Sequence, residues 1–371
     1  MEGNNPDEAI KPVIEAKEPS VEVQPKEKKP LIPALKEFYS AHYKKLLIIP
    51  IVLLVLAIIQ IAVQTATTGE FMKKDVSLKG GLTVTVLTDK EISPEILKNA
   101  LSSDLPSNDI SVRLLKSVAA TSGIIISADI ENEKSDELLA SIEKNLGIEL
   151  TPDTYTIEVM GSTLGASFFR ETFKTLYIAF LFMAMVVFLF FGTSLKYKAI
   201  SIALTLLAAY SLLINKSLAT DIIAYILGPV LIVIYTINSI PSIAVILAAF
   251  SDIIITLAVV NLIGMKISTA GIAAFLMLVG YSVDTDILLS TRVLKRKEGT
   301  VIDRIFGAMK TGLMMTLTTS AAVILTLIFT GSETITQIMT IIFIGLLADI
   351  INTWIQNAGI LLIYLEKKKN E

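Results

Sequence analysis

Long apolar segments make up most of the chain, and one long polar stretch interrupts them. After a first segment at 46–65, apolar runs return beyond residue 173, at about 175–192, 199–215, 221–238, 241–264, 268–290, 311–330 and 335–365. A helix needs about 20 apolar residues to cross the hydrocarbon core of a bilayer. The pattern predicts a polytopic α-helical membrane protein, with its first transmembrane helix at 46–65 and a transmembrane bundle at 174–366.

The polar stretch at 66–173 has the periodicity of a small α+β domain. Alternating apolar positions predict four strands, at 81–87, 110–115, 124–130 and 154–159. Ser93 and Pro94 provide the cap and first residue of a helix that extends to about residue 103. A second helix is expected at 135–145, and a turn near 121–123. The order β-α-β-β-α-β is that of a ferredoxin-like domain.

The stretch at 193–238 leaves two topologies open. Its two apolar runs are short, and Gly228 and Pro229 lie inside the second. If both runs cross the membrane, the protein has six core spans plus an inserted two-span hairpin. If neither crosses, it has six spans. Both topologies leave the orientation of every later span unchanged.

Charge is distributed unevenly along the chain. Residues 1–45 are assigned to a disordered cytoplasmic tail, since 1–30 are rich in Glu, Lys and Pro; no secretory signal peptide is expected there. Basic residues cluster before the first span, at Lys196 and Lys198, at 292–304, and in a basic tail at 367–371. By the positive-inside rule, a multi-pass protein of the cell membrane with both termini cytoplasmic and an acidic extracytoplasmic domain is predicted.

Composition narrows the function classes. Only 18% of residues are charged and the mean hydropathy is +0.67, whereas a soluble domain carries about 25% charge. The chain has no cysteine and one histidine, His42, which we place at the membrane interface. Disulfide scaffolds, thiolate sites and histidine zinc sites are therefore excluded, and no phosphate-binding GxxxxGK[ST] motif occurs. We expect a non-enzymatic protein without catalytic residues, cofactor, metal or nucleic-acid partner.

Ionisable residues inside the apolar runs are the strongest functional signal. A carboxylate at the bilayer centre costs roughly 2.5–3.5 kcal/mol on insertion scales, and such residues can relay protons. Asp284 and Asp286 project about 200° apart on one helix, so only one can face an interior path. Lys310 and Asp349 could instead lie near helix ends and reach the interface. The proton-coupling candidates are Asp252, Asp284, Asp286 and, as a counter-charge, Lys310.

Several motifs together resemble the SecF branch of the SecD/SecF family of protein-export membrane proteins, in its archaeal form. The most specific is the GYSVDTDILLSTR segment, and the resemblance covers roughly 45–365. The other matching segments are Lys79-Gly80-Gly81, Ser251 to Thr256, Thr316 to Thr319 and Gly345 to Gly359. The family-motif positions are Gly280, Tyr281, Ser282, Thr285, Arg292, Thr318, Asp349 and Asn352.

The resemblance implies an auxiliary subunit of the Sec translocase, within the proton-driven resistance–nodulation–division superfamily. Its implied partners are SecD, the SecYE translocon, the translocating polypeptide and membrane lipids. The resemblance also implies that the extracytoplasmic domain engages the emerging polypeptide while the bundle uses the proton motive force. Two alternatives stay open: a transporter of a lipid or small molecule from the same superfamily, and a membrane anchor for a binding domain.

The sequence departs from the bacterial form of the family at three places. Bacterial members resemble GYSxNDT, with an acid where this chain has Thr285, and they carry an arginine where it has Thr311. The family pattern also has six spans, so the 193–238 stretch is an insertion relative to it. The resemblance therefore assigns the proton-carrier role to this motif as a whole, and it does not identify one residue of the motif as the carrier.

Overall fold

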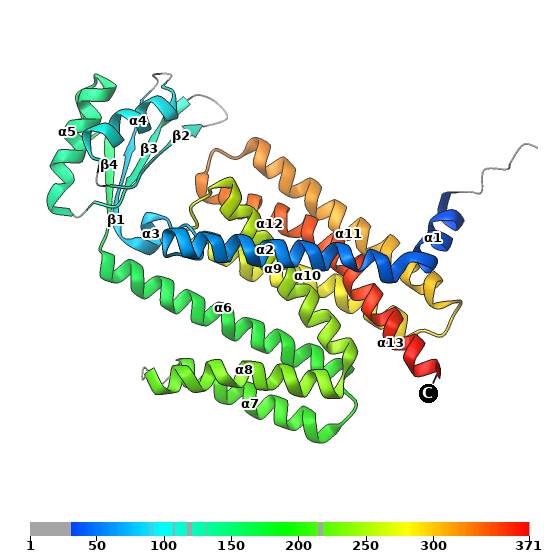
Figure 1. Ribbon diagram of the computed structural model, residues 1–371. Helices are drawn as coiled ribbons and strands as arrows, with labels where there is room; N and C mark the ends of the chain where they lie inside the picture. The colour runs from blue at the N-terminus through cyan, green and yellow to red at the C-terminus, as the bar shows by residue number, and fades with distance from the viewer. Residues whose placement is uncertain are drawn as a thin grey trace, which may run out of the picture.

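The computed structural model describes residues 31–370 apart from 89, 91, 107, 117–120, 131 and 214–217. A small four-stranded sheet with two helices stands at one end of a long helical bundle, and the carboxyl terminus lies at the other end (Figure 1). The predicted disorder of residues 1–30 lies outside the described residues.

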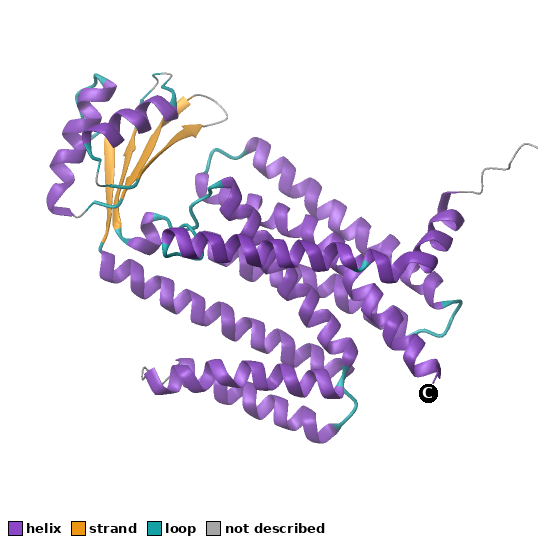
Figure 2. Ribbon diagram, in the orientation of Figure 1, coloured by secondary structure: helices purple, strands orange, loops and turns teal. Residues whose placement is uncertain are grey.

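The sheet domain has the predicted order of elements. Its order along the chain is β1-α4-β2-β3-α5-β4, and the sheet order is β2-β3-β1-β4 with every neighbouring pair antiparallel. Both helices cover one face of the sheet (Figure 2). The elements are β1 (Gly81–Val86), α4 (Pro94–Asp104), β2 (Ile110–Lys116), β3 (Thr121–Ala128), the 3-10 turn η1 (Asn132–Lys134), α5 (Ser135–Leu146) and β4 (Tyr155–Met160).

Alternation of apolar residues explains this arrangement. Every second residue of β1 is buried, and Leu82 and Val86 are fully covered by the two helices' apolar faces. Ser93 and Pro94 stand at the predicted start of α4. The predicted turn at 121–123 is wrong, because β3 begins at Thr121 and pairs with β2 across an irregular register at Leu115 and Lys116.

The bundle contains long helices joined by short connections. Among the described residues, eight helical segments are long and apolar enough to cross a membrane. The short α3 (Val76–Lys79) links the first long helix to the domain. The other elements are α2 (Ile48–Thr68), α6 (Ser162–Phe191), α7 (Leu195–Leu213), α8 (Leu218–Asn238), α9 (Ile240–Ile263), α10 (Thr269–Lys295), α11 (Val301–Phe329), α12 (Glu333–Ile351), the π-helix η2 (Asn352–Asn357) and α13 (Ala358–Asn370).

Helix α6 begins before the predicted end of the polar domain. Helix α6 begins at Ser162, so the expected boundary at residue 173 falls inside a helix. Its first turns have the aromatic side chains Phe169 and Phe173, which pack against Phe71 after α2. This tertiary packing extends the helix beyond the apolar run that the sequence pattern identified.

The 193–238 stretch forms two antiparallel helices, α7 and α8, beside α6 (Figure 1). Near the start of α8, the carboxylate of Asp221 is buried and accepts from Lys174 Nζ at 2.7 Å, with Arg170 Nη2 at 3.5 Å. The hairpin is thus joined to α6 by charge as well as by apolar packing. Pro229 lies within α8 without ending it.

One segment that was expected to be disordered is helical. Residues 31–45, assigned above to a disordered tail, belong to α1 (Leu31–Leu46). Tyr43 and Leu47, four residues apart, are buried against α13, and this contact orders the helix. The basic tail expected from residue 367 continues α13 to Asn370.

Candidate functional site

Three carboxylic acids meet inside the bundle, one from each of three helices. Asp252 on α9, Asp286 on α10 and Asp349 on α12 are at most 1% exposed. The faces around them are rich in small residues, such as Ala248 and Ala249, which let the helices approach closely. We call Asp252, Asp286 and Asp349 the acid cluster.

Asp252 is held by two side chains from neighbouring elements. Its Oδ2 accepts from the Ser282 hydroxyl of α10 at 2.5 Å, and its Oδ1 accepts from the Asn352 amide of η2 at 2.7 Å. Both donors are fully buried. These bonds connect α9 to α10 and to the π-helix through one carboxyl group.

Asp286 and Asp349 share a donor. The hydroxyl of Thr353 lies 3.0 Å from Asp286 Oδ1 and 2.8 Å from Asp349 Oδ1. Asn357 donates to the same Asp286 oxygen at 2.7 Å, and the Thr285 hydroxyl lies 3.1 Å from Asp349 Oδ1. A hydroxyl has one proton, so Thr353 can donate to only one acid at a time. The two acids are therefore linked through a donor that can switch between them.

The π-helix supplies donors to all three acids. A π-helix pairs residues five apart and often marks a functional site. Here the Ala358 N–H donates to the Thr353 carbonyl. Asn352, Thr353 and Asn357 from this single wide turn reach Asp252, Asp349 and Asp286. A change in the register of this turn would alter the contacts of the whole cluster.

No cation balances the acid cluster among the described residues. Burying ionised carboxylates without a partner is costly, and three together would also repel one another. Some acceptor atoms are unpaired, including Asp286 Oδ2, Asn352 Oδ1 and Asn357 Oδ1. The arrangement suits carboxyl groups that take up and release protons. In the part of the chain that the structure describes, no group of three or more His, Cys, Asp or Glu side chains is arranged to hold a metal ion.

The GYSVDTD motif divides between two faces of α10. Ser282, Thr285 and Asp286 point into the bundle, whereas Gly280, Tyr281 and Asp284 are exposed on the outside. The sequence prediction that Asp284 and Asp286 face different ways is thus confirmed. The structure brings Asp286 into the acid cluster and leaves Asp284 away from it.

Three further predicted residues lie outside the cluster. Lys310 and Thr318 are exposed on α11, and Lys310 forms no ion pair with any described residue. Arg292 Nη1 donates to the Gly307 carbonyl at 2.6 Å and so joins the end of α10 to α11. Lys310 therefore does not balance the buried acids, and Arg292 has a helix-joining contact.

Three residues, one acid of the cluster and two of its donors, were underestimated from sequence. Asp349 was left open as a residue that might lie at the interface, yet it is buried at the centre. Thr353 and Asn357 were not identified at all. The signal that could have found them is the polar run NTWIQN within an otherwise apolar span, because unneeded amides inside a membrane are costly.

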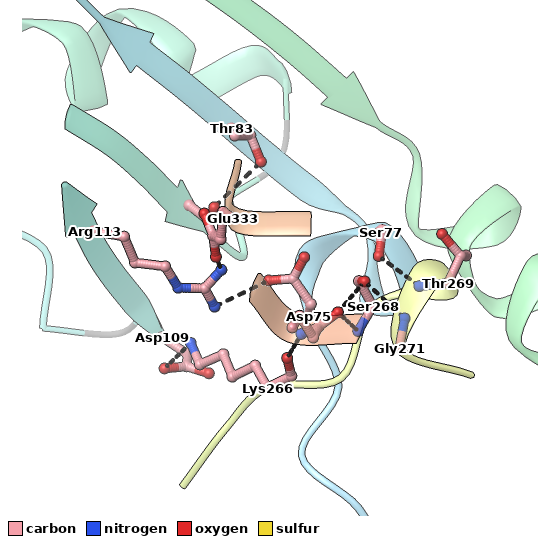
Figure 3. A network of polar contacts seen from close by, with 12 residues as sticks. Asp75, Ser77, Thr83, Asp109, Arg113, Lys266, Ser268, Thr269, Gly271 and Glu333 are labelled. Carbon is pink, nitrogen blue, oxygen red and sulfur yellow. Dashed lines mark hydrogen bonds and ion pairs between the residues drawn. The ribbon is translucent and has the colours of Figure 1, made fainter. Parts of the chain in front are cut away.

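A second polar network joins the domain to the bundle (Figure 3). The guanidinium of Arg113 on β2 pairs with Glu333 at the start of α12 and lies 3.8 Å from Asp75. Lys266, between α9 and α10, pairs with Asp109 at 2.9 Å. We call these ion pairs the domain contact.

Electrostatics and backbone bonds reinforce this contact. Burial opposes the charge of Asp109, but the Lys266 ammonium outweighs it and lowers the pKa of Asp109. The Asp75 N–H donates to the Ile267 carbonyl at 2.9 Å. A cleft of about 500 Å³ lies beside the domain contact, lined by the open face of the sheet and by the ends of α10 and α12.

Comparisons with known proteins agree on one family. The family model for the C-terminal part of the protein export membrane proteins SecD and SecF matches residues 208–367. A protein-export membrane protein SecF from Pyrococcus furiosus is 32% identical over 337 residues, which cover 91% of this chain and 96% of that protein. SecF from Methanocaldococcus jannaschii is 33% identical over 87% of this chain and 96% of its own length.

One solved structure has a similar fold. The crystal structure of SecDF from Thermus thermophilus, described as a translocon-associated membrane protein, matches 89% of this chain with a TM-score of 0.56 and 16% identity. The match spans only 38% of the SecDF chain. The likeness concerns the fold, and this chain corresponds to less than half of that larger protein.

Proposed function

Since this chain belongs to the SecF family of protein-export membrane proteins, we propose that it is an auxiliary subunit of the Sec translocase. It acts with SecD to promote the export of polypeptides through SecYE, and it draws energy from the proton motive force. The acid cluster is the site of proton uptake and release. The sheet domain is the part that engages the emerging polypeptide.

The proposed topology has eight spans, an extracytoplasmic ferredoxin-like domain and cytoplasmic termini. The sheet order β2-β3-β1-β4 and the eight long apolar helices support it. So do α1 and the carboxyl terminus, which lie at the end of the bundle away from the domain. Cysteines at Ser40 and Ser103, tested with an impermeant thiol reagent on whole cells, should react only at residue 103. Labelling at residue 40 alone would refute this orientation.

One observation supports the proposal most directly. The helices that contain the three acids also take part in the domain contact. Asp252, Asp286 and Asp349 lie on α9, α10 and α12. The α9–α10 connection contributes Lys266 to the domain contact, and α12 begins with Glu333. Along α12, Glu333 and Asp349 are 16 residues, or about 24 Å, apart.

This geometry provides a mechanical connection. Protonation of an acid removes a charge and changes which of its hydrogen bonds are favourable. Because Thr353 serves two acids on different helices, such a change shifts the preferred spacing of α10 and α12. Rigid helices transmit that shift to their far ends, where the domain is attached. The domain then moves relative to the membrane as protons pass, which favours outward movement of a bound polypeptide.

The outward face of α10 and α11 is the proposed contact surface for SecD. It has an exposed acid, Asp284, and an exposed base, Lys310, among apolar side chains such as Met277 and Met314. Charged residues in contact with lipid tails are unfavourable. A neighbouring subunit that covers this face would give both residues a polar environment.

The test compares two chemically identical substitutions on one helix. Asp286→Asn keeps the size of the buried side chain and removes its titration, whereas Asp284→Asn does the same on the exposed face. In vesicles with an imposed proton gradient, Asp286→Asn should abolish stimulation of export, with insertion and SecD association retained. Asp284→Asn should retain proton-driven stimulation, and any loss should come with weaker SecD association, because Asp284 lies on the proposed SecD surface. Wild-type export by the Asp286→Asn variant would refute proton coupling at the cluster.

A further inference from the structure

Helix α1 lies across the end of the bundle opposite the domain and contacts three separate elements. Lys36 Nζ pairs with Asp303 of α11 at 2.6 Å, and Lys44 Nζ pairs with Glu366 of α13 at 3.0 Å. Between these two ion pairs, the Tyr39 hydroxyl donates to the Trp354 carbonyl of the π-helix at 2.9 Å. Helix α1 therefore bridges α11, η2 and α13.

The Trp354 carbonyl lies at the point where the π-helix returns to the α-helical hydrogen-bond pattern. Carbonyls in a π-helix pair five residues ahead, and those in an α-helix pair four ahead. Where the pattern returns to α, two successive carbonyls compete for one N–H. The Ala358 N–H donates to the carbonyls of Thr353 and Ile355, and the carbonyl between them, that of Trp354, accepts from Tyr39. A buried carbonyl without a donor is costly, so this bond favours the π register.

Packing fixes the same residue from the other side. The indole of Trp354 lies directly over Gly312 of α11, where a Cβ would come within 2.3 Å of its ring. Tyr39 is also edge-on to Phe306, with ring centroids 5.9 Å apart. Trp354 is thus held between α1 and α11, and its sequence neighbour Thr353 faces the acids.

We propose that α1 is a strap that holds the π-helix in register, and that Tyr39 is a positioning residue for the acid cluster. This inference rests on the proposed function for its consequence, since Tyr39 touches none of the acids. It acts through the Trp354 carbonyl on the turn that supplies Asn352, Thr353 and Asn357. Release of α1 would let the turn change register and withdraw these donors.

The experiment uses the full chain in lipid vesicles and the substitution Tyr39→Phe. Trp354 is the single tryptophan of the chain, so its fluorescence reports on the π-helix directly. We expect greater quenching of Trp354 by acrylamide and about fivefold faster amide exchange confined to 352–359, as for the loss of one hydrogen bond. Gradient-driven export should fall at least twofold.

Tyr43→Phe is the matched control. Tyr43 lies one turn further along α1, is buried, and has no hydrogen bond to the π-helix. It should leave fluorescence, exchange and export unchanged. A merely structural role of α1 would instead give faster exchange throughout α1 and α11 in both variants, and that result would overturn the strap.

The readouts separate this inference from the proposed function. If Trp354 quenching and amide exchange at 352–359 are the same in Tyr39→Phe as in the wild type, the proposal that α1 acts as a strap is refuted. This holds whatever Asp286→Asn does to export. Faster local exchange with full export, while Asp286→Asn abolishes export, refutes Tyr39 as a positioning residue. If Asp286→Asn also leaves export at the wild-type rate, the proton-coupling function fails, and the role of Tyr39 at that site fails with it.

Discussion

The sheet domain and the bundle place polar and apolar residues in opposite ways. In the domain, Leu82 and Ile126 are completely buried, and the charged residues that the structure describes lie outside the core. In the bundle, Leu56 and Val63 are more than half exposed, whereas Asp252 is completely buried. The domain core follows from exclusion of water. The apolar surface of the bundle is suited to contact with lipid tails. Within the membrane, a carboxyl group finds hydrogen-bond donors in the interior of the bundle and not among the lipid tails.

The contrast shows what holds each region together. Burial of apolar surface stabilises the domain. Lipid tails are as apolar as leucine, so helices in a membrane associate through close packing of small residues and through polar contacts. The acid cluster and its donors are therefore a structural contact between α9, α10 and α12. Loss of a donor should loosen the bundle, and loss of a surface leucine should not.

The largest effect should come from truncating a domain core residue. Leu138→Ala opens a cavity in a fully buried position of α5 and should lower the stability of the domain by about 2–5 kcal/mol. Leu325→Ala removes the same atoms from a residue of α11 that is 56% exposed, and should change stability by less than about 0.5 kcal/mol. Limited proteolysis of the solubilised full chain against temperature measures both. Equal losses in the two variants would contradict the contrast.

A smaller loss is expected for a buried hydroxyl of the bundle. Thr353→Val preserves shape but leaves Asp286 and Asp349 without their shared donor, which should cost about 1–3 kcal/mol. Thr318→Val is the control, since Thr318 is exposed and bonds only to its own helix at Met315. Detergent-extract thermal stability compares them. A neutral Thr353→Val would mean that the shared hydroxyl does not join α10 to α12.

The smallest effect concerns an exposed contact within the domain. Hydrogen bonds from Lys144, Asn145 and Ser141 lower the pKa of Asp104 to about 2 and tie α4 to α5. The folded pKa is below the usual value near 3.9, so the stabilisation is present above about pH 4 and is lost as pH falls toward 2.

Asp104→Asn should make the melting temperature of the domain less dependent on pH in that window. The measurement is the domain melting temperature between pH 2 and 5, compared with the unaltered chain. If the melting temperature of the Asp104→Asn variant depends on pH as strongly as that of the unaltered chain, other carboxyl groups cause the dependence.

Local pattern was sufficient for the elements of the domain. The strand at 81–86 and the helix from Pro94 were predicted within a residue or two, because alternation and a proline at the first helical position act over a few residues. The start of α6 at Ser162 was missed, since the contacts of Phe169 and Phe173 with a distant segment extend that helix.

By itself, the sequence determined which segments are long and apolar and which ionisable residues lie inside them. It also determined that Asp284 and Asp286 face different ways, since the angle between two residues on one helix is fixed by the helical repeat. It could not determine which of the two faces inward, because uniformly apolar helices in a bilayer carry little signal of their orientation.

Only the tertiary structure decided that Asp286 joins Asp252 and Asp349, and that Asp284 lies outside. The rotation of each helix depends on packing against its neighbours. The π-helix at 352–357 was equally undetermined by local pattern. Its wider turn costs backbone pairing, and contacts from residues as distant in sequence as Tyr39 and Gly312 hold it in place.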